Sequence, residues 1–408
     1  MKSGWVTKKL GEVCAFRRGL TYSKGDEVEH SSKVVLRANN ISLEKNQLCF
    51  DELKFIRDDF EIPDDKYLEK DCLLICTASG SKTHLGKVAY IDKEYDFAFG
   101  GFMGLIVPDE SQLFPRYLYY ALTSENYRHF IQRLTDGANI NNLKFTQLSE
   151  FDIPIPPLAE QKRIVAKIDA AFEKIDALKA NAERNLANAK ELFQSALDEA
   201  MRPKKGWVEK RLGEVCCKIG SGATPRGGKA SYCAEGVSLI RSMNVYDCEF
   251  EYSELAHIND IQAKELANVT IEAKDVLINI TGASVARCCV VPSDVIPARV
   301  NQHVAILRIA DGNFINPEFL CYILVAPSKK TLLLGIGEAG STRQALTKSD
   351  LSSFKINFPD IAEQMEIVKK VRSLSQDCKR LQQNYSQQIA DCAEMRQGIL
   401  REAFEGRL

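Results

Sequence analysis

The sequence lacks the features that mark several common classes of protein. No uninterrupted apolar run approaches the ~18 residues of a membrane-spanning helix, and the N-terminus MKSGWVTKKL has no apolar core of a signal peptide. None of the thirteen cysteines forms a C-x-x-C pair, and the five histidines are not spaced with them as metal ligands are. We therefore expect a cytoplasmic protein with reduced, mostly buried thiols and no metal site.

Motifs of nucleotide chemistry and catalysis are also scarce. The stretch GATPRGGKA resembles a phosphate-binding loop, but Ala223 replaces its first glycine and Ala230 replaces the Ser or Thr that would bind magnesium. There is no G-x-S-x-G or H-E-x-x-H motif. The only Pro-Pro pair, Pro156-Pro157, lacks the preceding Asn or Asp of an adenine methyltransferase motif. We expect no catalytic residues.

Charge of one sign is not in excess either. The chain has 54 Lys and Arg against 55 Asp and Glu, for a formal net charge of −1. A free-standing DNA-binding protein usually carries a basic excess, because neutralising phosphates supplies much of its affinity. The composition, 45% hydrophobic and 27% charged, is that of a globular protein, and 408 residues predict two or more domains.

The chain does contain a long internal repeat. GWVTKKLGEVC at 4–14 returns as GWVEKRLGEVC at 206–216, with two substitutions. LRANNI returns as IRSMNV, KDCLLICTASGS as KDVLINITGASV, and LSEFDIPIPPLAEQKRIVAKI as LSSFKINFPDIAEQMEIVKKV, at a similar offset. A period this long indicates a tandem duplication rather than a solenoid, whose repeats span roughly 20 to 50 residues.

Each copy combines strand signals with a long helical stretch. Short β-branched and apolar runs bounded by Gly, Asn, Asp and Pro predict strands, so the class is α+β. After each AEQ, apolar residues recur at spacings of three and four as in a coiled coil, including Leu178 in the first copy and Leu381 in the second. We expect two similar domains, each followed by a helix of about 40 residues, roughly 60 Å long.

The two helices are predicted to pack on each other as an antiparallel coiled coil, giving the molecule pseudo-two-fold symmetry. The alternative is that each helix only covers its own domain. By residue number the predicted division is 1–157 for the first domain, 158–203 for the central helix, 204–360 for the second domain and 361–408 for the C-terminal helix. Trp5 and Trp207, near the start of each domain, are interpreted as packing anchors.

The order of the domains and several of the repeated blocks resemble those of a known family. Two variable domains, each ended by IPIPPLAEQKRIVAKID or its echo and followed by a long helix, resemble the specificity subunit of type I restriction-modification systems. GWVEKRLGEVCCKIGSGATP, KDVLINITGAS and GSTRQALTKSDLSSFKI are similar to that family's target recognition domains. The resemblance covers nearly the whole chain.

The resemblance implies a function. Each target recognition domain would read one half of an asymmetric bipartite site in double-stranded DNA, and the helices would fix the spacing and dock two methyltransferase subunits. Those partners would carry S-adenosylmethionine and methylate adenine at N6. Restriction-motor subunits using ATP and magnesium would join in the full complex. The chain itself would be non-catalytic and would bind no cofactor.

Candidate DNA-contacting residues are clusters, in predicted loops, of the side-chain types that read base edges: Arg for guanine, Asn or Gln for adenine, and Ser or Thr for either, together with the Lys residues in the same clusters. In the first domain they are Arg37, Asn39, Asn40, Ser79, Ser81, Lys82, Thr83, Lys87, Asn139, Asn141, Asn142 and Lys144. In the second they are Arg226, Lys229, Arg241, Asn244, Thr281, Ser284, Arg287, Ser341, Thr342, Arg343, Gln344 and Lys348.

For each of these residues the alternative is a solvated or turn-forming side chain. Two further functions also stay open at this point: a non-catalytic scaffold whose two domains bind protein partners, and an enzyme with an unrecognised site. Loops as different as TASGSKTHLGK and TGASVARCCVV favour DNA recognition, since a symmetric scaffold has no need for them.

Overall fold

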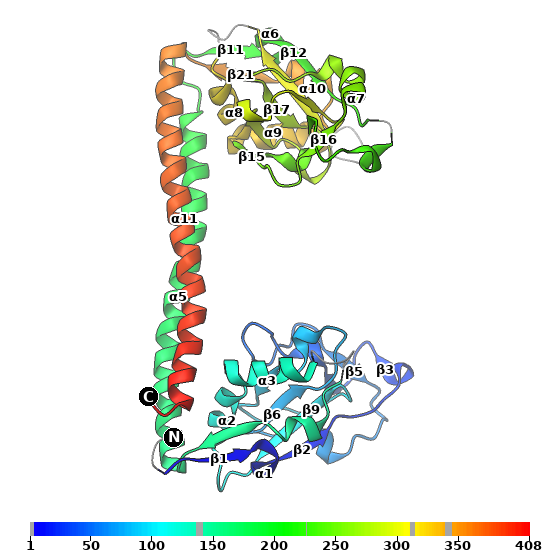
Figure 1. Cartoon of the computed structure of the whole chain (residues 1–408), viewed down its shortest axis with the longest axis vertical. Coiled ribbons are helices and arrows are strands. Elements are labelled where there is room, and N and C mark those ends of the chain that lie inside the picture. The colour runs from blue at the N-terminus through cyan, green and yellow to red at the C-terminus, as the bar shows by residue number, and fades with distance from the viewer. Residues whose placement is uncertain (1–3, 136–141, 226, 311–314, 339–344) are drawn as a thin grey trace. The chain divides into compact units, whose positions relative to one another are not determined.

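A computed structural model describes residues 4–135, 142–225, 227–310, 315–338 and 345–408, apart from the side chains of Lys82, Lys229 and Ala230. The chain forms two compact units: unit 1 comprises 1–182 with 387–408, and unit 2 comprises 183–386. Each unit therefore joins one globular region to parts of both long helices (Figure 1).

The described residues of unit 1 form three small sheets with strand orders β1-β10, β2-β9-β6-β7 and β3-β5-β4-β8. Its strands are β1 Val6–Lys9, β2 Cys14–Arg18, β3 Glu27–Val28, β4 Lys33–Leu36, β5 Lys54–Ile56, β6 Leu73–Cys76, β7 Val88–Tyr90, β8 Phe97–Phe99, β9 Met103–Pro108 and β10 Asp152–Ile155. Its α-helices are α1 Leu10–Val13, α2 Pro115–Ala121, α3 Glu125–Thr135, α4 Phe145–Leu148, the first part of α5 Leu158–Ala200 and the last part of α11 Ile361–Phe404. Its 3-10 turns are η1 Lys24–Asp26, η2 Ala38–Asn40, η3 Asp64–Lys66 and η4 Lys82–His84.

Unit 2 repeats this plan with strand orders β11-β21, β12-β20-β17-β18, β16-β13-β19 and β14-β15. Its strands are β11 Val208–Arg211, β12 Cys216–Ser221, β13 Val237–Ile240, β14 Val245–Tyr246, β15 Glu249–Phe250, β16 Ala256–Ile258, β17 Val276–Asn279, β18 Cys288–Val290, β19 Ala298–Val300, β20 Val304–Ile309 and β21 Lys355–Phe358. Its α-helices are the last part of α5, α6 Leu212–Val215, α7 Asp260–Glu265, α8 Pro317–Val325, α9 Pro327–Glu338, α10 Lys348–Ser353 and the first part of α11 Ile361–Phe404. Its 3-10 turns are η5 Gly228–Ser231, η6 Ser242–Asn244, η7 Ala267–Val269, η8 Gly282–Ser284 and η9 Ser293–Val295.

We call the sheets β2-β9-β6-β7 and β12-β20-β17-β18 the main sheets. In each of them one inner strand, β6 or β17, is buried on both faces. In β6, Leu73 and Ile75 join the core below α2 and α3, whereas Leu74 and Cys76 join the core on the opposite face. A strand covered on both sides reads as a continuous apolar run, as LLIC and VLIN do. Buried apolar residues lie on both faces of β17 too.

The long helices pack against each other within each unit. In unit 1, Arg396 of α11 pairs with Asp176 of α5, and Arg163 of α5 donates to the carbonyl oxygen of Leu408 at 2.7 Å. Residue numbers thus fall along α11 as they rise along α5, so the packing is antiparallel. In unit 2, Leu197 of α5 shares a core with Ile367 of α11.

The expected α+β class, with two similar domains each followed by a long packed helix, is confirmed. The prediction of which apolar residues along the two long helices are buried is wrong in part. The Leu178 side chain is 55% exposed and Leu381 is exposed as well, while Val165, Phe172 and Leu197 are buried outside the predicted positions. These burials follow the contacts with each globular region, because a helix that covers both a partner helix and a domain buries more than one narrow stripe.

The repeated AEQ motif joins each helix to its own globular region. The Gln161 side chain is fully buried: its Oε1 accepts from the backbone N–H of Phe114 at 2.7 Å, and its Nε2 donates to the carbonyl oxygens of Gln112 and Pro156. Gln364 likewise accepts from the N–H of Asn316. This use of a buried amide explains why the motif returns in both copies.

Trp5 is buried in the core of unit 1, and Trp207 packs edge-on against Phe319 and donates from Nε1 to Glu363. Both contacts agree with the predicted packing role. All thirteen cysteines are free, and the described residues contain no group of three or more potential metal ligands. Within the described ranges no single helix has the length and hydropathy to cross a membrane; only α8 and α9, taken together across a 69° bend, meet that test.

The stretch GIGEAG, from Gly335, has the glycine spacing of a dinucleotide-binding turn. That turn must connect a strand to the start of a helix. Gly335 and Gly337 instead lie inside α9, which follows another helix, so the spacing carries no such site.

Candidate DNA interface

Three segments of unit 1 meet where strands of its main sheet end. Beyond β6, the N–H groups of Thr77 and Ala78 both donate to the carbonyl oxygen of Phe102, in the turn between β8 and β9. The N–H of Leu143, from the segment before α4, donates to the carbonyl oxygen of Thr77 at 2.6 Å. We call the surface formed by residues 77–83, 100–103 and 142–144 the first edge.

Unit 2 builds the same junction from equivalent segments. Ile280 donates its N–H to the carbonyl oxygen of His303 at 2.9 Å, and Leu346 donates to the carbonyl oxygen of Ile280 at 2.8 Å. Thr281 forms an isolated bridge with Ala345, as Ala78 does with Asn142 in unit 1. We call the surface formed by residues 280–287, 301–304 and 345–348 the second edge.

The structure brings together predicted clusters that are far apart in the sequence. Asn142 and Lys144 are exposed on the first edge beside the loop that carries Ser81 and Thr83. On that loop the Ser79 hydroxyl accepts from the N–H of Ser81, and the Ser81 and Thr83 hydroxyls lie 2.8 Å apart. These bonds hold the shape of the loop while leaving Ser81 and Thr83 at the surface.

The second edge carries a comparable set. Lys348, the first residue of α10, is exposed, and Ser284 ends the η8 turn. The Arg287 guanidinium lies 4.5 Å from the ring centroid of Tyr246, close enough for a cation–π interaction that orients its charge. The Thr281 hydroxyl is bonded to Nδ1 of His303.

Asn40 and Asn244 have a structural role, which corrects the prediction that they contact DNA. Asn40 is buried; its Oδ1 accepts from the N–H of Arg37 at 2.8 Å, and its Nδ2 donates to the carbonyl oxygens of Cys49 and Glu52 at 2.9 Å. Asn244 makes the matching bonds in unit 2: its Oδ1 accepts from the N–H of Arg241, and its Nδ2 donates to the carbonyl oxygen of Glu251. Neither amide is available to a base.

We predict that Asn40→Ala lowers the free energy of unfolding by about 1–3 kcal/mol, because it removes three hydrogen bonds between a buried side chain and the backbone. Asn39→Ala, at the exposed neighbouring position, should change stability by less than about 0.5 kcal/mol. Urea unfolding of both variants measures the difference. Equal stabilities would contradict the structural role of Asn40.

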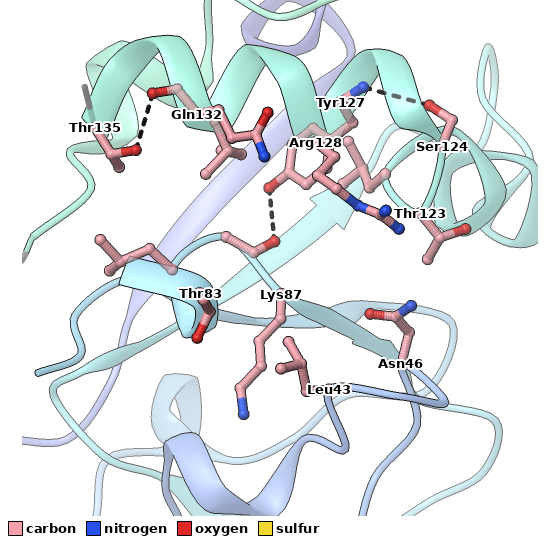
Figure 2. Close-up of a pocket in the computed structure, with 14 residues that line it drawn as sticks. Leu43, Asn46, Thr83, Lys87, Thr123, Ser124, Tyr127, Arg128, Gln132 and Thr135 are labelled. Carbon is pink, nitrogen blue, oxygen red and sulfur yellow. Dashed lines mark hydrogen bonds between the residues drawn. The ribbon is translucent and has the colours of Figure 1, made fainter. Parts of the chain in front are cut away.

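Lys87 is buried as well, and its ammonium is engaged. Its Nζ donates to the carbonyl oxygen of Ile41 at 2.7 Å and lies 3.0 Å from Nδ1 of His84, and burial lowers the pKa of Lys87. Figure 2 shows its side chain running past Leu43, away from α3. In unit 2 the buried Asn279 side chain donates to the carbonyl oxygen of Val245 at 3.4 Å, at the position that matches Ile41, and to that of Ser242 at 2.8 Å. Lys87 therefore holds the loop rather than presenting a free charge, which corrects its predicted DNA contact.

A cavity of about 390 Å³ lies between this loop and α3. Thr83, Tyr127 and Arg128 are among its lining residues (Figure 2). The Tyr127 hydroxyl donates to the carbonyl oxygen of Gly86 at 2.9 Å, which ties α3 to the loop after β6. The cavity thus shares the loop that forms part of the first edge.

Arg37 and Arg241 follow equivalent strands and lie close to the edges. The carbonyl oxygen of Leu36, one residue before Arg37, accepts from the N–H of Gly100 in the first edge. The Arg241 guanidinium packs over the Tyr232 ring and donates to the carbonyl oxygen of Glu254. Asn39 is exposed and donates to Glu52 at 3.1 Å.

Several predicted contacts lie outside the described residues. They are Asn139, Asn141, Arg226, Ser341, Thr342, Arg343 and Gln344, together with the side chains of Lys82 and Lys229.

Residue-type reasoning missed four side chains at the edges. Arg18 ends β2, is exposed, and borders a small hollow of about 80 Å³ that is also lined by Asn142 and Lys144. Phe102 projects from the first edge, and Gln302 and His303 belong to the second. In the sequence, Arg18 could have been found because Gly19 marks the end of its strand. Phe102, Gln302 and His303 could have been found because they lie in the short turns before β9 and β20.

Comparison with known proteins places both halves of the chain in one family. Residues 2–186 and 204–391 match the model described as the type I restriction modification DNA specificity domain. The chain is 26% identical to the StySPI specificity subunit of Salmonella potsdam and 25% identical to the EcoKI specificity subunit of Escherichia coli K12. Each alignment covers all of this chain and 90% of the relative.

Solved structures share the fold. A chain from a study of complex assembly and conformational transition of the type I R-M system superposes with a TM-score of 0.79 at 21% identity, covering 100% of this chain and 99% of that one. The HsdS subunit of Thermoanaerobacter tengcongensis superposes with a TM-score of 0.59 at 21% identity, covering 100% and 98%.

Proposed function

The chain belongs to the family of type I restriction-modification DNA specificity domains, and we propose that it is the non-catalytic subunit that selects the DNA sequence for such a complex. Each recognition domain reads one half of an asymmetric, bipartite site through its edge. The two long helices set the distance between the halves. The chain provides sequence readout, and its partners provide the chemistry.

The observation that carries this proposal is one backbone junction built twice with different side chains. The hydrogen bonds of Thr77 and Leu143 in unit 1 are repeated by Ile280 and Leu346 in unit 2. Exposed Asn142 in the first junction occupies the position that Ala345 occupies in the second junction. A scaffold that repeats its backbone but varies its surface suits the reading of two different base sequences.

We propose two methyltransferase subunits and restriction-motor subunits as protein partners. The near-zero net charge fits such an assembly, because methyltransferase subunits that close around the duplex can supply many of the phosphate contacts. The helices α5 and α11 offer the docking surface. Their exposed apolar side chains include Leu192 and Met365.

We expect the reaction to be methylation of adenine at N6, with S-adenosylmethionine held by the methyltransferase subunits. ATP and magnesium are assigned to the motor subunits that cleave unmodified DNA. In this arrangement the residues of the present chain position the duplex and transfer no group.

Selection from a random duplex pool tests the proposed function. The purified complex of this chain with its methyltransferase subunit should enrich one motif with two specified parts and a fixed unspecified spacer. The methyltransferase subunit alone serves as the control and should enrich none. A complex of verified composition that retains no duplex would contradict the proposal and favour a protein scaffold.

Asn142 and Lys144 allow base readout to be separated from phosphate contact. Asn142→Ala should weaken binding to the cognate site by about 1–3 kcal/mol and relax the first half-site, leaving non-specific binding unchanged. Lys144→Ala should weaken cognate and unrelated DNA alike and reduce the salt slope by about 1. Fluorescence anisotropy at several salt concentrations distinguishes the two results. Equal effects of both variants on all sequences would remove Asn142 from base readout.

A further inference from the structure

The turn that precedes β9 in unit 1 and β20 in unit 2 is the same structural position in both domains. Met103 donates its N–H to the carbonyl oxygen of Gly100, and Val304 donates to that of Asn301. Two residues after these acceptors, the carbonyl oxygen of Phe102 accepts from the segment after β6, and that of His303 accepts from the segment after β17. These bonds align Phe102 with His303.

The side chains at this position have opposite chemistry. Phe102 is 71% exposed, which places it among the most exposed large apolar residues of the described chain. His303 is half-buried in a polar chain: Nδ1 is bonded to the Thr281 hydroxyl, and Nε2 lies 3.0 Å from Nε2 of Gln302. Oε1 of Gln302 is in turn bonded to the Thr224 hydroxyl.

The backbone of the first turn does not require a phenylalanine. The carbonyl of Phe102, which joins the segments, would be present with any residue, and Gly100 and Gly101 allow the close approach to Leu36 and Leu20. A single exposed apolar residue is ordinary on a protein surface. The location of Phe102 is informative, because the same edge carries exposed Asn142 and Lys144 and borders exposed Arg18.

We propose that Phe102 determines specificity in the first half-site by an apolar contact with one base, a contact that the polar side chains of Gln302 and His303 do not offer at the matching place of the second half-site. This inference rests on the proposed DNA-reading function. The chemistry available to a phenyl ring at a base is contact with the thymine C5 methyl group or with an exposed ring face. Neither contact is made with a phosphate.

The test uses the full chain in complex with its methyltransferase subunit and a duplex that carries the motif selected by the wild-type complex. Each thymine of the first half-site is replaced by deoxyuridine, which removes only the methyl group, and each base in turn by an abasic residue. Wild-type affinity should fall roughly five-fold to 100-fold at one position. Phe102→Ala should lower affinity by a similar factor and abolish the sensitivity at that position.

The two modified duplexes distinguish the source of the contact. Sensitivity to deoxyuridine that Phe102→Ala removes identifies the methyl group, and sensitivity to the abasic residue alone identifies the ring face. Ile261→Ala, which removes an equally exposed apolar side chain from unit 2, is the matched control and should leave the first half-site unchanged. Phe102→His should shift base preference in the first half-site only.

Two results would overturn the inference. One is that Phe102→Ala and wild type show the same sensitivity at every position. The other is that Phe102→Ala weakens cognate and unrelated duplexes by the same factor. Failure of the proposed function is recognised earlier, because the wild-type complex would then select no motif at all.

Discussion

Four residues inserted into each long helix should abolish methylation of the native site and create a site whose spacer is longer by about one or two base pairs. The insertions belong between Ala182 and Glu183 in α5 and between Ser386 and Gln387 in α11, where the chain passes from one unit to the other. Four helical residues add about 6 Å, and one base pair of duplex occupies about 3.4 Å. Methylation mapping of the modified chain measures the spacer.

An insertion in α5 alone provides the control. It would lengthen α5 between the units without a matching change in α11, so that the antiparallel contacts of unit 1, such as Arg396 with Asp176, could not form together with the helix contacts of unit 2. Methylation should therefore be lost with no new motif. Retention of the native spacer with full activity after the double insertion would contradict the role of the helices in spacing.

Gln161→Leu should lower the free energy of unfolding of unit 1 by about 3 kcal/mol or more. The variant leaves the N–H of Phe114 and the carbonyl oxygens of Gln112 and Pro156 buried without their present partner, and each such group costs about 1–3 kcal/mol. Urea unfolding measures the loss.

Gln364→Leu should produce a comparable loss in unit 2, because that side chain connects α11 to Asn316 and Pro359. Lys167→Ala, an exposed change on α5, is the control and should stay within about 0.5 kcal/mol of wild type. A loss below about 1 kcal/mol for both Gln variants would show that water or rearranged backbone replaces the buried amides.

Repetition and periodicity made the fold predictable from the sequence. The matching blocks identified the duplication, and the spacing of apolar residues identified helices that the structure places at Leu158–Ala200 and Ile361–Phe404. The exposure of Leu178 was not predictable from spacing, because burial there depends on which surfaces of α5 meet α11 and the globular region.

The candidate interface was less predictable, because residue type does not reveal burial. Asn40 belongs to the type that reads adenine, yet it binds the carbonyl groups of Cys49 and Glu52, which lie many residues further along the chain. Lys87 is bound by Ile41 in the same way. Phe102 was overlooked because a search for hydrogen-bonding side chains excludes aromatic ones.

A map of N6-methyladenine tests the central claim most directly. This chain would be expressed with its methyltransferase subunit in a host that lacks adenine methylation, and the modified positions would be read across the genome. The account predicts one two-part motif with a fixed spacer, and a change confined to the first half when Asn142 or Phe102 is replaced. Absence of methylation despite a verified complex, or a motif without two separate halves, would contradict it.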